Sequence, residues 1–197
     1  MPERRRGAAL ERALLDAAWA ELVERGYANF TMDAVVARAG TSPPVLYRRW
    51  SNRQELLRAA IAHAAQRDLI KVPDAGSLRG DMLALLRHVN ATRTDLAAVM
   101  SVHLGEYYQE TGTSPADLRD LLLAGQPDPL DAIYRRAVAR GEIDPERLTE
   151  KMKRLPIDLL RAEFLMVLQP LPDTAIVEIV DTIFMPLVRL PTTGIRD

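Results

Sequence analysis

Residues Thr31 to Trp50, which read TMDAVVARAGTSPPVLYRRW, contain side chains that can bind DNA. Arg48 and Arg49 can hold phosphates or pair with a guanine, and the Tyr47 hydroxyl suits a phosphate oxygen. A helix-turn-helix places the first residues of its second helix against base edges in the major groove. In this chain those residues are Thr41, Ser42, Pro43, Pro44 and Val45. The pattern predicts contact with double-stranded DNA; a solvated helix face is the alternative for the two arginines.

Other chemistries find little support in the sequence. The chain has no cysteine, which excludes disulfides and thiol catalysis. His63, His88 and His103 are too scattered for a metal-binding pair at helical spacing. Neither a Gly-x-Ser-x-Gly elbow nor a glycine-rich phosphate loop occurs. We therefore expect no enzyme activity, no metal and no cofactor.

Charge is distributed unevenly along the 197 residues, although the formal net charge is only −1. Residues 1–53 carry nine arginines and six acids, a balance of +3. Residues 54–197 carry 17 basic and 21 acidic residues, a balance of −4. A basic module on an acidic body is expected when only one end of a protein meets a polyanion.

Short helices are predicted to position the DNA-binding segment. Apolar residues at helical spacing predict an amphipathic helix over about residues 8–25. Thr31 is a good N-cap for a second helix, which Gly40 ends. The third helix, over about residues 42–50, is the predicted recognition helix. Ser42 can cap it, and the two prolines that follow fit a first turn, where their missing N–H groups have no intrahelical partner.

The rest of the chain also has a helical pattern. A fourth helix, begun by Ser51 or Asn52, is expected to reach about residue 72 and to link two domains. Later helices are expected over about residues 115–124, 129–140, 145–168 and 174–190, with Pro156 and Pro186 kinking or interrupting the last two. The predicted fold is all-α, with a three-helix helix-turn-helix domain at 1–53 and a helical effector-binding and dimerisation domain at 54–197.

Six residues of the second domain could line a small-molecule pocket. Methionine adapts to irregular ligands, and His and Tyr offer polar groups on apolar walls. The six are Met82, Leu86, Met100, His103, Tyr107 and Met152. Packing in an apolar core is the alternative for each of them.

The last helices carry apolar residues on two faces, which indicates a dimer interface. One face can pack on the core of the protomer, and the second then needs a partner. We expect a two-fold dimer through a four-helix interface. The residues predicted to form it are Leu159, Ala162, Met166, Val177 and Phe184. A helix buried all round in a monomer is the alternative.

The stretch ERGYANFTMDAVVARAGTSPPVLYRRWSNRQELLRAAI resembles the N-terminal domain of the tetracycline-repressor (TetR) family, over about residues 10–62. The matching elements are Gly26-Tyr27, the Thr31 cap, Ala37-x-Ala39-Gly40, Ser42, Leu46-Tyr47, Trp50 and Arg53-x-Glu55-Leu56. The resemblance implies about nine helices, phosphate contacts by Thr31, Tyr47 and Arg49, and base contacts by residues 41–45. It also implies that Arg53 stands beside the DNA backbone, where the family usually has lysine. By the same resemblance, the N-terminal arm of Arg4, Arg5 and Arg6 reaches the minor groove; a disordered, solubilising arm is the alternative.

Two departures from the family pattern affect the expected readout of bases. Thr41 stands where a small apolar residue is usual, and Pro43-Pro44 replaces more polar residues. Direct hydrogen bonds to bases are therefore expected to be sparse, with thymine methyl contacts or DNA shape supplying specificity.

The sequence thus predicts a cytoplasmic, homodimeric transcriptional regulator without a membrane segment. We expect a repressor that a small molecule bound in the C-terminal domain releases from a palindromic DNA operator. An effector-independent regulator or an activator is the first alternative, and a helical enzyme or small-molecule carrier is the second. Neither the operator sequence nor the effector can be named from these residues.

Overall fold

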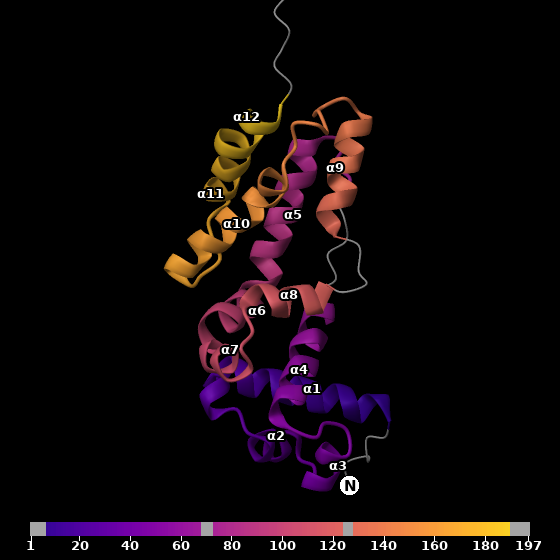
Figure 1. Ribbon diagram of the computed structural model, residues 1–197, viewed down its shortest axis with the longest axis vertical. Helices are drawn as coiled ribbons and strands as arrows, with labels where there is room; N and C mark the ends of the chain where they lie inside the picture. Colours follow the sequence, from indigo (N-terminus) through magenta and orange to yellow (C-terminus); the bar gives the residue numbers. More distant parts are fainter. Residues whose placement is uncertain (1–6, 68–72, 124–127, 190–197) are drawn as a thin grey trace, which may run out of the picture. The chain divides into compact units, whose positions relative to one another are not determined.

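The computed structural model describes residues 7–67, 73–123 and 128–189, and these residues are helical apart from turns and an isolated β-bridge between Ile143 and Arg189. They pack as two compact units (Figure 1). The first unit takes its residues from 1–69 and 95–124, and the second from 70–94 and 125–197. The all-α prediction is confirmed. Among the described helices, none is long and apolar enough to cross a lipid bilayer.

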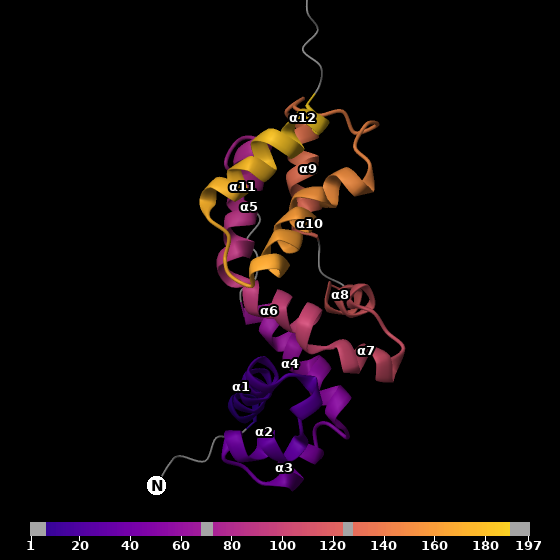
Figure 2. The same ribbon diagram turned by 90° about the vertical axis from the view of Figure 1, so that its left-hand side faces the viewer.

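The N-terminal part of the first unit contains four α-helices: α1 (Ala8–Arg25), α2 (Met32–Ala39), α3 (Pro43–Tyr47) and α4 (Arg53–Arg67), with a 3-10 turn η1 (Tyr27–Asn29) after α1. Helices α2 and α4 both pack on α1, and α3 packs on α2 (Figure 2). Their shared core includes Leu14, Leu22, Val35, Leu46 and Leu57. A helix of five residues is not stable alone. Burial of its apolar side chains in the core shared with α1, α2 and α4 therefore holds α3 in place.

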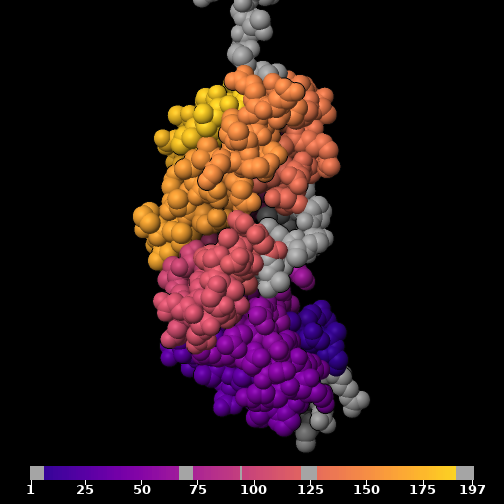
Figure 3. All heavy atoms as spheres, in the orientation of Figure 1, coloured from indigo at the N-terminus to yellow at the C-terminus, as the bar shows by residue number. Residues whose placement is uncertain are grey.

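A second segment completes the first unit: α6 (Thr94–Ala98), the π-helical turn η2 (Val99–His103), α7 (Gly105–Thr111) and α8 (Pro115–Leu123). Residues of this segment, including Val99, Leu104 and Tyr107, are buried in the same core as α1 and α4. Figure 3 shows its surface directly against the N-terminal helices. The predicted domain boundary between residues 53 and 54 therefore does not coincide with the division made by packing.

The second unit contains α5 (Leu78–Thr92), α9 (Pro129–Ala139), α10 (Glu150–Val167), α11 (Asp173–Glu178), the π-helical turn η3 (Ile179–Phe184) and α12 (Met185–Val188). Helix α5 packs against α9, α10 and α11. Buried charge adds to this packing: the carboxylate of Asp81 has no exposed surface and lies 3.3 Å from Arg136 and 3.5 Å from Arg140. Because an unpaired buried charge is costly, these contacts fix α5 against α9.

Side-chain caps begin several of the helices. Ser114 and Asp117 form a reciprocal cap, with the Ser114 N–H donating to Asp117 Oδ2 at 2.8 Å and the Asp117 N–H donating to Ser114 Oγ at 3.3 Å. The side chain of Asp128 accepts the Leu130 N–H at 2.9 Å. Asn52 caps α4, because its Oδ1 accepts the Glu55 N–H at 2.9 Å. The choice left open between Ser51 and Asn52 is thereby resolved.

Other boundaries differ from the prediction. Helix α10 begins at Glu150 rather than near residue 145, because Thr149 is its cap and accepts the Met152 N–H at 3.2 Å. Pro156 does not interrupt α10. Before Pro186, by contrast, the helix widens into η3, since a proline cannot donate to the preceding turn. Such breaks give more helices than the nine or so predicted. The proposed end of the fourth helix, residues 68–72, lies outside the described residues.

Candidate nucleic-acid interface

Helices α2 and α3 form a helix-turn-helix whose turn is fixed by backbone geometry. Thr31 caps α2, because its Oγ1 accepts the Ala34 N–H at 3.1 Å. Gly40 has φ 62° and ψ 41°, the left-handed conformation that glycine adopts without steric cost. The N–H of Gly40 donates to Ala37 O at 3.3 Å, and that of Thr41 donates to Val36 O at 3.2 Å. This pair of bonds is a Schellman motif, which ends α2 and turns the chain toward α3.

Helix α3 is shorter than the predicted recognition helix over residues 42–50. It covers Pro43–Tyr47, and hydrogen bonds from Arg49 N and Trp50 N to Leu46 O, at 2.9 and 3.1 Å, continue the turn beyond it. Leu46 has no exposed surface and Trp50 is 9% exposed. The remaining side of α3 is therefore free to meet a ligand.

The residues predicted to read bases lie at the exposed start of α3. Ser42, Pro43 and Pro44 are exposed, and Thr41 and Val45 are half-buried. The Ser42 side chain makes no capping hydrogen bond, so its hydroxyl is not used by the helix. This end of the helix presents the Ser42 hydroxyl beside the apolar rings of two prolines.

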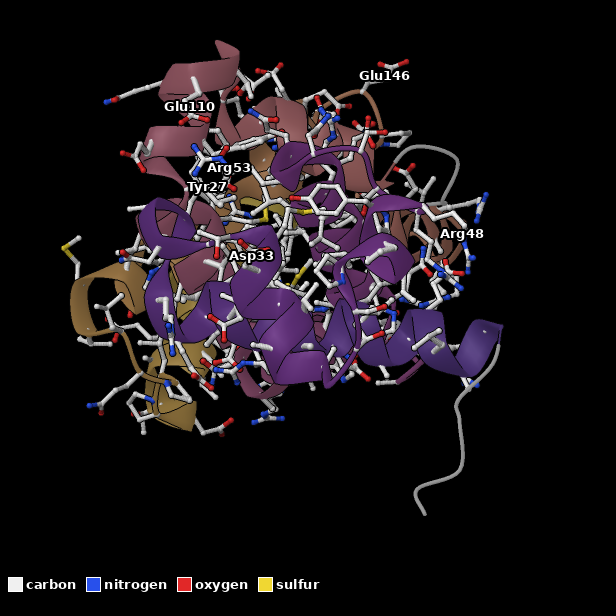
Figure 4. All side chains as sticks on the ribbon, turned by 90° about the horizontal axis from the view of Figure 1, so that it is seen from below. Tyr27, Asp33, Arg48, Arg53, Glu110 and Glu146 are labelled. Atoms are coloured by element: carbon white, nitrogen blue, oxygen red, sulfur yellow. The ribbon has the colours of Figure 1, made fainter. Side chains whose placement is uncertain are left out.

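Tyr47 and Arg48 follow on the outer side of α3. The Tyr47 side chain is 49% exposed. Arg48 is exposed and, within the part of the chain that the structure describes, has no hydrogen bond or ion pair. Figure 4 shows Arg48 pointing outward. Arg49 differs, because its Nη1 donates to Val45 O at 3.1 Å and its side chain lies along the helix. Tyr47, the last residue of α3, and Arg48, which caps its end, are thus the long polar side chains that extend from this part of the unit.

Arg53, the first residue of α4, has partners of its own. It forms an ion pair with Glu110 of α7, and its guanidinium carbon lies 4.3 Å from the centre of the Tyr27 ring. The Tyr27 hydroxyl donates to Glu110 Oε2 at 2.7 Å. Figure 4 shows these three side chains together. The predicted phosphate-binding arginine is therefore paired with a carboxylate of another segment.

Acidic residues near α2 are largely neutralised by arginine. Arg38 donates Nε–H to Glu21 Oε1 at 2.7 Å and Nη1–H to Glu24 Oε1 at 2.8 Å. The Arg38 hydrogen bond holds the pKa of the Glu24 carboxyl below its ordinary value of 4.5, so Glu24 is ionised and paired. Asp33 in the first turn of α2 is exposed, where the helix dipole stabilises a negative charge.

Two protein-family models together match most of the chain. Residues 14–60 match the model of the bacterial regulatory proteins of the tetR family, and residues 72–183 match a tetracyclin repressor-like C-terminal domain, which alone covers more than half of the sequence. This chain belongs to the TetR family. It is a DNA-binding transcriptional regulator and not an enzyme.

Relatives and solved structures agree with membership of the TetR family. The chain is 33% identical over 187 residues to the DNA-binding transcriptional repressor TetR of Mycobacteroides abscessus, covering 93% of this chain and 96% of that one. An uncharacterized HTH-type transcriptional regulator of Mycobacterium tuberculosis, Rv1556, is 32% identical to this chain. The matched region covers 84% of this chain and 81% of that protein. The fatty acid degradation regulator FadR of Bacillus halodurans has the same fold, with a TM-score of 0.70 at 18% identity over 98% of this chain and 99% of that one.

The structure separates the six residues predicted to form an effector pocket of this TetR-family protein. Met82 and Leu86 have no exposed surface and lie in the core of the second unit, and Met152 is partly buried against that core. Met100, His103 and Tyr107 belong to the first unit. Tyr107 packs edge-on against Tyr27, with ring centres 5.4 Å apart. Because three of the six residues lie in each unit, they do not form one site within either unit.

The predicted dimer residues lie in different environments. Met166 is 82% exposed and Ala162 is also exposed, whereas Leu159 and Val177 are half-buried. Phe184 has no exposed surface and packs against Tyr134, with ring centres 6.3 Å apart. Phe184 is therefore a core residue of its own protomer, and its place in the predicted interface is corrected. The π-helical turn η3, which the helical periodicity did not reveal, changes which residues of this segment face outward.

The sequence did not predict two residues of the candidate site, Tyr27 and Glu110. Tyr27 and Glu110 were not predicted to contact Arg53, and no local pattern signals a pair 57 residues apart. Arg4, Arg5 and Arg6 lie outside the described residues.

Among the residues that the structure describes, no cluster of three or more His, Asp or Glu is placed to hold a metal ion.

Proposed function

We propose that the chain binds a palindromic operator through α2 and α3 and represses transcription from the adjacent promoter. The observation that carries this proposal is the exposed outer side of α3. The fold does not use the start of this helix, Tyr47 or Arg48 for packing. A helix-turn-helix presents these positions to the major groove. A bacterial regulator acts where the chromosome is, so we also propose a cytoplasmic location.

Phosphate contacts are assigned to the margins of this surface. Thr31 caps α2 through its oxygen lone pair, and its hydroxyl proton can still be donated to a phosphate. Tyr47, Arg48 and Arg49 supply further donors, since Arg49 uses only one of its five N–H groups on Val45 O. The arm of Arg4, Arg5 and Arg6 belongs to the proposed set, and Arg53 joins it when its guanidinium is released from Glu110.

Base recognition is assigned to residues 41–45. Ser42 can exchange hydrogen bonds with a base edge, and the rings of Pro43 and Pro44 offer apolar contact to thymine methyl groups. With Thr41 and Val45 half-buried, few polar groups reach the groove, so sequence-dependent DNA shape supplies much of the discrimination.

Two copies of α3 are needed to read two half-sites, and we propose that the second unit supplies the dimer interface. Exposed apolar side chains on α10 and the last helices support this assignment: Met166 is 82%, Leu187 49% and Ile183 37% exposed. A stable dimer covers about 800 Å² on each partner. With Ala162 and the half-buried Leu159 and Val177, these residues form the proposed face.

Release of the operator by a small molecule bound within residues 54–197 is the remaining part of the proposal. It is supported by resemblance, and no lining residue is assigned because the six candidates are divided between the two units. An effector must bind the non-operator conformation better by about 1.4 kcal/mol for tenfold release. A thermal-shift screen of metabolites, followed by operator release with each hit, tests this part; a screen without any shift favours the effector-independent alternative.

A nuclease footprint of the purified protein on its own upstream DNA tests the central proposal. We expect a protected palindrome with half-sites about one helical turn apart or somewhat more. Tyr47→Ala should weaken protection strongly. Arg135→Ala is the matched control for a surface substitution, because Arg135 is exposed on α9 and makes no ion pair within the described residues. Failure of wild-type protein to protect any palindrome would overturn the proposal.

A further inference from the structure

Three side chains from separate segments meet around the Glu110 carboxylate. Tyr27 of η1 donates its hydroxyl to Oε2 at 2.7 Å, and Arg53 of α4 pairs with the other oxygen, Oε1. The Arg53 guanidinium also lies over the Tyr27 ring, at 4.3 Å from its centre. Figure 4 shows the three side chains converging. We call these three residues the Arg53 cluster.

Tyr27 gives the Arg53 cluster a rigid base. Its side chain has no exposed surface, and the Tyr107 ring packs edge-on against it at 5.4 Å. Burial, together with the hydrogen bond to Glu110, raises the pKa of Tyr27 to about 12, so the hydroxyl keeps its proton and remains a donor at neutral pH. The Tyr27 hydroxyl holds Glu110, and the Tyr27 ring supports the Arg53 guanidinium. Together they fix the position of Arg53 beside Glu110.

Glu110 and a DNA phosphate compete for the same cation. Arg53 stands at the start of α4, directly after the helix-turn-helix, and its side chain is 32% exposed. A guanidinium binds carboxylates and phosphates through the same planar edge. When Glu110 occupies that edge, its negative charge also repels the phosphate backbone. The ion pair therefore reduces what Arg53 can contribute to DNA binding.

We propose that Glu110 is a positioning residue that withholds Arg53 from the DNA backbone and thereby couples operator affinity to the position of α7. This inference rests on the proposed function, since it takes the DNA backbone to lie beside α4. Glu110 touches no DNA and acts only through Arg53. Tyr107 anchors the middle of α7 on Tyr27, so the variable part is the last turn, which carries Glu110. A movement of that turn away from Tyr27 frees Arg53 for a phosphate, and a movement back removes that contact.

Local structure supports α7 as the variable element. It follows the π-helical turn η2, a geometry found frequently at functional sites, and it ends at Gly112 in the left-handed conformation. Its contacts with η1 are those that carry Tyr27 and Glu110. The Arg53 cluster thus connects the helix-turn-helix to a segment that lies within residues 72–183, the part matched by the C-terminal domain model.

Glu110→Gln tests the inference, because glutamine keeps the size of the side chain and removes the charge that holds Arg53. Fluorescence anisotropy with the footprinted operator should show affinity about threefold to tenfold higher than wild type. The slope of log affinity against log salt should steepen by about 0.9 for each additional phosphate neutralised, or about 1.8 for a dimer. Glu106→Gln is the matched control: it removes the same charge from an exposed residue of α7 that has no ion pair in the described part of the chain. It should change neither quantity appreciably.

Arg53→Gln in the Glu110→Gln background identifies the route of the effect. The affinity gain and the steeper slope should both disappear, because the freed cation is gone. Glu110→Asp, which keeps the charge on a shorter stem, should give a smaller gain and covers the case in which Glu110→Gln does not fold. A merely structural role for Glu110 would lower the melting temperature and affinity without steepening the salt slope.

The outcomes separate the inference from the function on which it rests. If wild-type protein binds the operator and Tyr47→Ala does not, but Glu110→Gln and Glu110→Asp leave affinity and slope unchanged, the inference is wrong and the proposed function stands. If wild-type protein binds no operator, the proposed function itself fails, and the inference fails with it.

Discussion

Arg38 of α2 donates its Nε hydrogen to Glu21 of α1 at 2.7 Å, and the Glu21 side chain is only 4% exposed. A buried carboxylate without its partner keeps the full cost of desolvation. This ion pair therefore holds the helix that carries the turn to α3 against the first helix of the unit.

Arg38→Met should lower the free energy of unfolding by about 1–3 kcal/mol, because Glu21 would keep only the longer ion pair to Arg25 at 3.3 Å. Urea unfolding followed by circular dichroism measures this change. Arg25→Met is the control: that side chain is 58% exposed, and its removal should cost less than about 1 kcal/mol. Equal destabilisation of the two variants would contradict the role given to Arg38.

Gly26→Ala should also destabilise the protein, by about 1–3 kcal/mol. Gly26 has φ 68° and ψ 173°, a conformation that side chains rarely adopt, and an added Cβ would lie 3.1 Å from His103 Nδ1. Gly105→Ala provides the opposite expectation, because Gly105 begins α7 without a positive φ and with open space around its missing Cβ. It should stabilise the protein by about 0.4–1 kcal/mol, as judged by melting temperature. A Gly26→Ala variant as stable as wild type would show that this turn is not strained.

The second unit should become less stable in acid through its surface ion pairs. Arg87 donates to both oxygens of Asp173, at 2.6 and 2.8 Å, and holds the pKa of that carboxyl below its ordinary value of 3.8. Because the folded-state pKa is the lower one, the pair stabilises the fold above the ordinary value and ceases to do so as pH falls through the folded pKa.

Arg87→Gln should therefore be less stable than wild type at neutral pH and equally stable in strong acid. Urea midpoints at pH values from about 7 down to about 2 would show the two curves converging below the ordinary carboxyl pKa. Arg135→Gln is the control, because Arg135 is exposed without an ion pair in the described residues. A difference between Arg87→Gln and wild type that persists in strong acid would assign the destabilisation to packing instead.

Met166→Lys should convert the proposed dimer to monomers, since a charge would replace the most exposed apolar side chain of the proposed face. Sedimentation equilibrium measures the change in mass. Val102→Lys is the matched control, because Val102 is 54% exposed but lies on η2 in the first unit. Dissociation of both variants, or of neither, would count against the face on α10.

Local features of the sequence predicted the parts of the fold that local physics determines. The Thr31 cap, the Gly40 turn and the buried side formed by Leu46 and Trp50 all depend on residues a few positions apart. Helix ends at Ser114 and Asp128 were predictable for the same reason.

Long-range packing could not be predicted in this way. The pair of Arg53 and Glu110 requires α7 to lie against the start of α4, and only tertiary structure brings them together. Likewise, a helical period of 3.6 residues placed Phe184 on an outer face, whereas the π-helical turn η3 turns it into the core.

The salt dependence of operator binding tests the central claim most directly, that the free side of α3 meets DNA. Affinity should fall by more than about tenfold when Tyr47→Ala is combined with Arg48→Ala, and the slope of log affinity against log salt should become shallower by about 0.9 for each phosphate that is no longer neutralised. Arg135→Ala should leave both unchanged. Wild-type affinity and slope in the double variant would contradict the account, because α3 would then not be the surface that meets DNA.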